Sequence, residues 1–144
     1  MAQDARVHRA LRCLIVAGYT RVNLGEVEDQ APKFGFAPQL ESRFARNALG
    51  LEHAGITHYR IAPNFRIPFG HSHSEQEEIY VVLRGSGRLK LDDDVIELRE
   101  LDAVRIGPGT WRNVEGGPEG VEILAFGAAE DNTDVEMKQG WWTD

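Results

Sequence analysis

From residue 55 onward, short apolar runs alternate with turn-forming residues, a pattern typical of an all-β barrel or sandwich. The separators are rich in Gly, Pro, Asn and Asp, which supply turn conformations. Strands are expected over residues 55–62, 65–73, 79–83, 88–91, 95–98, 103–106, 111–114 and 121–126. The run 79–83 is apolar on both faces, which predicts a strand buried on both sides.

The part of the chain before residue 55 has a different pattern. Residues 1–18 form an N-terminal extension, either a frayed helix or an arm, and residues 19–24 alternate as a short strand does. Four apolar residues then recur at helical spacing, namely Leu40, Phe44, Ala45 and Ala48. Because Pro38 suits a first helical turn and Gly50 suits a helix end, the sequence predicts one short amphipathic helix that caps an end of the barrel.

The C-terminal segment, residues 128–144, begins acidic and ends in Trp141 and Trp142. Two adjacent tryptophans bury large apolar surfaces, so we expect this tail to dock on the barrel or on a second subunit. The predicted organisation is therefore an extension (1–18), one β-barrel domain (19–127) and a docking tail (128–144).

Composition and charge narrow the function classes. A chain of 144 residues is long enough for one domain with a single core. Its net charge of −7 leaves no broad basic surface, which disfavours nucleic acid and anionic membranes as partners and favours a small molecule. The single cysteine, Cys13, cannot form an internal disulfide, so we expect a reducing, cytoplasmic location. Residues 11–17 are too few to span a membrane.

Two histidines carry the clearest candidate chemistry. Side chains alternate along an extended strand, so His71 and His73 face the same side. Glu78 has the opposite parity, and its carboxylate returns to the same pocket only if the chain turns within residues 74–77. Tyr80 shares the parity of Glu78, so it either donates its hydroxyl inside or simply fills the barrel.

The spacing His-x-His-x4-Glu-x6-Gly, formed by His71, His73, Glu78 and Gly85, resembles the first motif of the cupins. Cupins are small antiparallel jelly-roll barrels, and the resemblance implies that these two histidines and this glutamate are metal ligands. Glu77 is the alternative carboxylate, but Glu78 matches the family spacing better. Single-domain cupins commonly pair through edge strands, so the resemblance also leads us to expect a homodimer.

The second cupin motif is only partly matched. Gly109 and its turn align, but four positions depart from the family pattern, namely Leu101, Gly107, Arg112 and Gly116. Arg112 stands where the family has a histidine that is its fourth metal ligand. Arginine is always protonated and cannot ligate a cation. Either three side chains and water hold the metal, or the site is metal-free and Arg112 recognises an anionic group. Trp111 is expected at the rim of the ligand pocket, and His58 is a possible spare ligand.

A site of two histidines and one carboxylate suits a non-haem Fe(II) oxygenase, and Mn, Ni, Cu and Zn accept the same nitrogen and oxygen ligands. We therefore expect a divalent transition metal and a small, anionic organic ligand inside the barrel, in an enzyme of the metal-dependent oxygenase kind. Two alternatives stay open. One is a binding module without turnover, and the other is a metal-free isomerase of sugars or organic acids with Arg112 as anion clamp.

Overall fold

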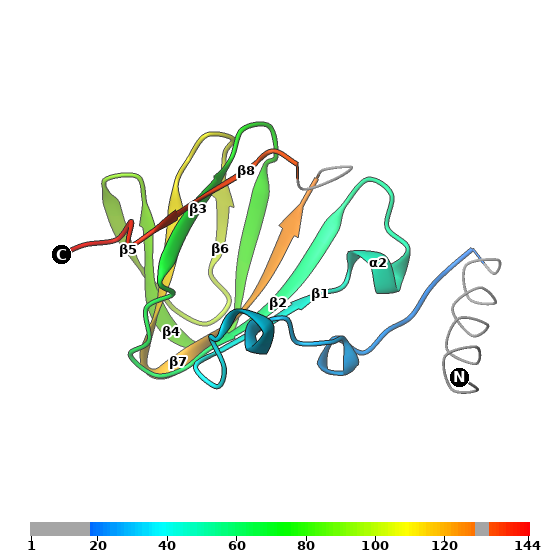
Figure 1. The fold of residues 1–144 in the computed structure, drawn as a ribbon, viewed down its shortest axis with the longest axis horizontal. Coiled ribbons are helices and arrows are strands. Elements are labelled where there is room, and N and C mark those ends of the chain that lie inside the picture. Colours follow the sequence, from blue (N-terminus) through cyan, green and yellow to red (C-terminus); the bar gives the residue numbers. More distant parts are fainter. Residues whose placement is uncertain (1–17, 129–132) are drawn as a thin grey trace.

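The structure is a computed structural model that describes residues 18–128 and 133–144. It is an all-β jelly roll with eight antiparallel strands (Figure 1). The strands are β1 (Leu40–Phe44), β2 (Gly55–Ile61), β3 (Phe69–His73), β4 (Glu78–Leu91), β5 (Asp94–Leu98), β6 (Ala103–Ile106), β7 (Arg112–Gly127) and β8 (Val135–Gln139). The helical elements are η1 (Leu24–Glu26), η2 (Ala31–Phe34) and α2 (Arg46–Leu49). No helix in the described ranges is long and apolar enough to cross a membrane.

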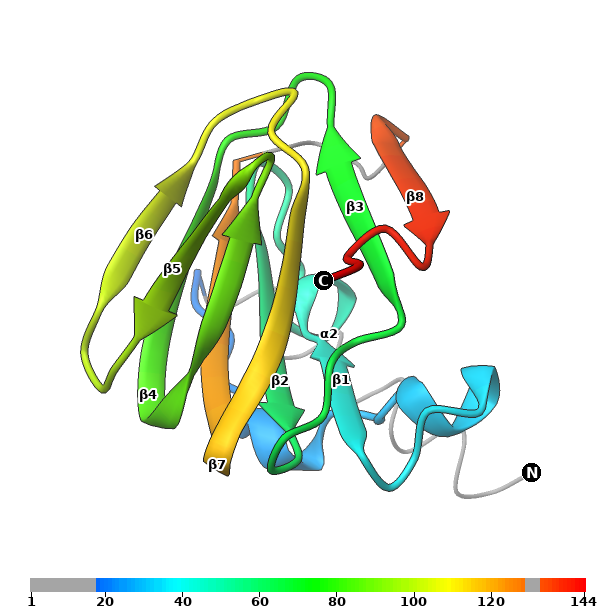
Figure 2. The same cartoon turned by 90° about the vertical axis from the view of Figure 1, so that its left-hand side faces the viewer.

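Two long strands, β4 and β7, pair along their whole length and connect the two layers of the barrel (Figure 2). In one layer the first part of β4 and the last part of β7 lie between β6 and β2, with β1 beyond. In the other layer the remaining parts of β4 and β7 lie between β5 and β3, with β8 at the edge. The site described below is built where β3 and the start of β4 face the space between these layers.

The bend in β4 explains why its two halves looked like separate strands. The register shifts between Val82 and Arg84 and again between Gly85 and Gly87, so the glycines mark bulges rather than a turn. Gly85 has a φ of 75°, and a Cβ there would lie 2.1 Å from the carbonyl oxygen of Gly120. The predicted strands 79–83 and 88–91 are therefore one strand. The same is true of 111–114 and 121–126, which join as β7.

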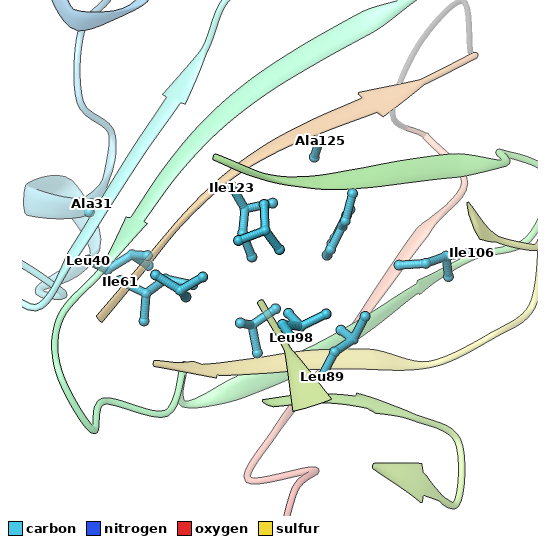
Figure 3. Packing of buried hydrophobic residues seen from close by; sticks show 12 residues of the cluster. Ala31, Leu40, Ile61, Leu89, Leu98, Ile106, Ile123 and Ala125 are labelled. Carbon is cyan, nitrogen blue, oxygen red and sulfur yellow. The ribbon is translucent and has the colours of Figure 1, made fainter. Parts of the chain in front are cut away.

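The core lies between the layers and takes its buried residues from every strand of the barrel except β3 and β8, together with Ala31 of η2. Leu40, Ile61, Leu89, Leu98, Ile106 and Ile123 all point into it (Figure 3). The prediction that residues 79–83 are buried on both sides was wrong. Tyr80 and Val82 face the core, whereas Ile79 is 43% exposed on the outer face.

Two predictions for the N-terminal half were also wrong. Residues 40–44 form strand β1, whose alternation buries Leu40 and Ser42, and only Arg46–Leu49 is helical. β1 is hydrogen-bonded to β2, which comes later in the chain, and this pairing outweighs the helical spacing of the apolar residues in β1. Residues 19–24 form no strand; a 3-10 turn begins at Leu24. The expectation for residues 1–17 lies outside the described residues.

The C-terminal segment contributes a strand as well as its tryptophans. β8 pairs with β3 along its whole length, from Phe69 opposite Gln139 to His73 opposite Val135. Trp142 is buried, and the guanidinium of Arg66 lies 4.2 Å from its ring centroid. Within the described residues, this tail docks on the barrel of its own chain.

Candidate metal centre and cavity

Three side chains that the sequence singled out converge between the layers. β3 presents His71 and His73 on the same side, with ring centroids 5.4 Å apart and planes perpendicular. Residues 74–77 turn the chain, and Glu78 opens β4 directly opposite. The candidate ligand atoms of the three residues all lie within 4.8 Å of one another. His71 Nε2 is 3.9 Å from Glu78 Oε2, and His73 Nε2 is 3.3 Å from Glu78 Oε1.

The chemistry of this cluster fits a divalent transition metal. Burial, followed by the positive charge of Arg112, lowers the pKa of His71 to about 4, so its imidazole is neutral near pH 7. A neutral imidazole offers the lone pair that a metal requires. Glu78 Oε2 is buried and accepts no well-aligned hydrogen bond. Two imidazoles and a carboxylate with unused acceptor capacity suit Fe, Mn, Ni, Cu or Zn.

Arg112 is the first residue of β7, lies opposite His71 and is completely buried. Its Nη2 lies 3.1 Å from Glu78 Oε2, and its Nη1 donates to the carbonyl oxygen of His71 at 3.5 Å. The guanidinium therefore points into the site, and Glu78 balances its charge. The chain itself therefore supplies a partner for this buried charge.

Asp134 is a member of the site that the sequence did not single out. It precedes β8, and its Oδ1 accepts a hydrogen bond from His73 Nδ1 at 3.0 Å. Its Oδ2 accepts from the backbone amides of Glu75 and Gln76 at 3.0 and 2.8 Å. Burial opposes ionisation, but these hydrogen bonds lower the pKa of Asp134 to about 2. Since a carboxylate only accepts, His73 Nδ1 carries the proton and Nε2 faces the cavity.

The three residues of the cluster and Arg112 line a cavity of about 410 Å³. Most of the wall is apolar or aromatic, and the residues that provide it include Phe36, Phe44, Tyr59, Ile67, Phe69 and Ile123. This volume is within the range of small-molecule sites. Tyr59 and Tyr80 also line it, and burial followed by the charge of Glu78 raises the pKa of both phenols. They therefore remain protonated donors at neutral pH.

Three other residues considered from the sequence lie away from this cluster. Trp111 does not line the cavity; it stacks on Trp141 with ring centroids 5.9 Å apart. Glu77 is exposed and pairs with Arg105. His58 faces the outer side of β2, where its Nε2 lies 2.7 Å from Glu122 Oε1. Only Glu78 of the two candidate carboxylates reaches the histidines.

Comparison with known proteins bears on the fold. Residues 57–126 match a family described as "Cupin domain". No curated protein sequence matches the chain with significance.

Solved structures similar to this chain cover most of its length. A cupin protein from Bacteroides fragilis is 23% identical, with a TM-score of 0.63, over 77% of this chain and 84% of that one. The polyketide cyclase RemF from Streptomyces resistomycificus is 22% identical, with a TM-score of 0.67, over 87% of each chain. A sugar phosphate isomerase from Silicibacter pomeroyi is 16% identical, with a TM-score of 0.64, over 83% and 92%. These likenesses show the fold, and the named activities belong to those proteins.

Proposed function

We propose that this chain, whose residues 57–126 match the cupin domain, is an enzyme that binds a divalent transition metal through His71, His73 and Glu78 and an organic ligand in the adjoining cavity. The observation that carries the proposal is the position of the cluster. The three side chains line a largely apolar cavity, so a molecule inside the cavity reaches them directly.

The cavity supports a ligand with two unlike parts. Its aromatic and aliphatic walls favour an apolar body of about the size of one or two rings. The buried guanidinium of Arg112 also lines the cavity, which favours an oxygen-bearing head such as a carboxylate or an enolate. The phenols of Tyr59 and Tyr80, kept protonated by burial, donate hydrogen bonds to such oxygens.

The residues of the chain have separable tasks in this proposal. Asp134 holds the ring of His73 so that Nε2 faces the cavity. Arg112 pairs with the Glu78 carboxylate. Burial opposes ionisation of Glu78, but its hydrogen bond with His73 and the charge of Arg112 lower its pKa. A bound divalent ion would supply Lewis-acid polarisation of a ligand oxygen. The apolar walls exclude water from that oxygen, which strengthens the electrostatic effect of every charged group around it.

A metal-free acid–base enzyme is a second candidate, favoured by the contact between His73 and Asp134. Burial opposes the charged form of His73, but its hydrogen bonds to Glu78 and Asp134 outweigh burial and raise its pKa. A histidine held by a carboxylate is a common general acid or base. This arrangement is compatible with an isomerase in which Arg112 binds the anionic end of the substrate.

Visible spectroscopy of the Co²⁺-loaded protein tests the main proposal. We expect addition of an aromatic hydroxy acid, with 1-hydroxy-2-naphthoate as the probe, to change the Co²⁺ absorption spectrum, because the ligand head lies beside the ion. The matched control Glu77→Gln changes an exposed neighbour and should respond as wild type does. Probe binding with an unchanged Co²⁺ spectrum, and with equal affinity after chelator treatment, would favour the metal-free candidate instead.

A further inference from the structure

The side chain of Gln76 lies inside the metal-binding cluster, although no motif marks it. It belongs to the turn between β3 and β4 and is only 4% exposed. Its Nε2 lies 3.3 Å from His73 Nε2 and 3.2 Å from Glu78 Oε1. The carboxamide therefore contacts two of the three candidate ligand atoms at once.

The backbone holds Gln76 in this position. Its amide N–H donates to Asp134 Oδ2 at 2.8 Å, the same carboxylate that orients His73. One aspartate thus fixes both a candidate ligand and the residue beside it.

The opposite strand leaves room for the carboxamide. Gly127 ends β7 directly across from Glu78. A Cβ at this glycine would lie 2.6 Å from Gln76 Cδ, 2.6 Å from Oε1 and 2.8 Å from Nε2. A side chain at position 127 would therefore require the Gln76 carboxamide to shift from its place in the cluster. The absence of a side chain at Gly127 is therefore what admits the amide to the site.

We propose that Gln76 Oε1 is the fourth protein ligand of the metal that His71, His73 and Glu78 hold, an inference that rests on the proposed function. Arg112 stands in the second motif where the resembling family has its fourth ligand, and a guanidinium cannot ligate a cation. A carboxamide oxygen is a neutral ligand that divalent ions such as Mn²⁺ accept. Gln76 supplies this oxygen from the first motif and so replaces the missing histidine.

The two ends of the carboxamide give this residue two states. In the structure, Nε2 donates to Glu78 Oε1 at 3.2 Å. A half-turn about the last side-chain bond exchanges Nε2 for Oε1 at the same place, because the two ends are alike in size. The carboxamide therefore has a partner in both states, Glu78 through Nε2 without the ion and the ion through Oε1 with it. The resulting ligand set has two nitrogens and two oxygens.

NMR of the wild-type protein tests the proposal directly. With ¹³C- and ¹⁵N-labelled glutamine, titration with Zn²⁺ should shift the Gln76 side-chain ¹³Cδ and NH₂ resonances more than those of any other glutamine. Gln76→Met identifies these resonances by their loss. Unshifted Gln76 resonances in a Zn²⁺-saturated protein would overturn the proposal.

Metal affinities, measured by competition with a chromophoric chelator, give the second test. We expect Gln76→Met to weaken Mn²⁺ and Zn²⁺ binding by ~10- to 100-fold. Gly127→Ala should weaken it similarly, and the double variant should be little worse than either, because both changes remove the same ligand. Glu77→Gln is the matched control and should bind as wild type does.

The outcomes separate this inference from the proposed function. Binding that His71→Ala abolishes but Gln76→Met leaves within about twofold would overturn the role of Gln76 and leave the three-residue site intact. Additive losses in the double variant would also overturn it. A wild-type protein that binds no divalent ion at all would overturn both proposals.

Discussion

Arg112 Nη2 lies 3.1 Å from Glu78 Oε2, so these two buried side chains form an ion pair inside the barrel. The pair connects the start of β7 to the start of β4. Burial opposes ionisation of Glu78, but its hydrogen bond with His73 and this pair lower its pKa, so a carboxylate stays ionised where a metal needs one. The pair also places a cation within reach of an anionic ligand. Stability and metal affinity therefore depend on the same contact.

Arg112→Met should destabilise the protein by about 3–5 kcal/mol, because it leaves the buried Glu78 carboxylate without a counter-charge. Urea unfolding measures the loss. Glu78→Gln in the Arg112→Met background should recover part of it, since the uncompensated charge is then removed. A cost below about 1 kcal/mol for Arg112→Met would show that the pair contributes little to folding.

Arg112→His should tighten Ni²⁺ or Co²⁺ binding by at least about tenfold, because it removes a positive charge beside the ion and offers a nitrogen ligand. The same change should weaken binding of small carboxylates to the cavity. Calorimetry measures both affinities on one protein. If metal affinity and carboxylate binding were both unchanged, Arg112 would contribute to neither, although it lies in the site.

Asp134→Ala should weaken metal binding by ~10- to 100-fold, although Asp134 touches no metal. The variant releases His73 Nδ1 and frees the amides of Glu75 and Gln76 from their acceptor. Asp93→Ala, in the exposed turn between β4 and β5, is the control for loss of one surface carboxylate. Equal metal affinity in the two variants would contradict a role for Asp134 in positioning His73.

Glu115 should make part of the stability dependent on pH. Burial opposes its ionisation, but hydrogen bonds from Arg88 and Arg66 lower its pKa below the ordinary 4.5. The folded-state value is thus below the unfolded one. The contribution is therefore fully present above about pH 4.5 and is lost as the pH falls through the folded-state pKa. Glu115→Gln should cost about 1 kcal/mol at pH 7 and less at pH 3 in urea unfolding. If the stability difference between Glu115→Gln and wild type did not change with pH, Glu115 would be excluded as the cause of the pH dependence.

The outer face of the barrel supports the prediction of a homodimer. Ile79 and Phe126 are register partners on β4 and β7 and are 43% and 39% exposed in the described structure. Neighbouring exposed apolar side chains favour burial against a second copy. Light scattering should give twice the mass of the 16.1 kDa chain, and Ile79→Asp should reduce it to the monomer. A wild-type mass of one chain at micromolar concentration would refute the dimer.

Local spacing predicted an all-β barrel with His71 and His73 on one side of a strand, and the resemblance to the cupins specified the jelly roll and the cluster with Glu78. Alternation along β3 places the two histidines on one side, and the turn over residues 74–77 returns Glu78 to them. The inward direction of Arg112 was expected from its position in the second motif, and the structure places it there.

Other parts of the site depend on contacts between distant residues. Asp134 lies beside His73 because β8 pairs with β3, and this pairing cannot be predicted from the local sequence pattern. The Gln76 carboxamide occupies the space that Gly127, on another strand, leaves by having no side chain. Likewise, β1 is a strand because β2 lies beside it, although its apolar residues recur at helical spacing.

Elemental analysis of the purified, metal-reconstituted protein tests the central claim most directly. The account predicts stoichiometric divalent metal in wild type and in the Glu77→Gln control, and little or none in His71→Ala. Equal metal content in all three proteins, or none in wild type, would contradict a metal centre at His71, His73 and Glu78.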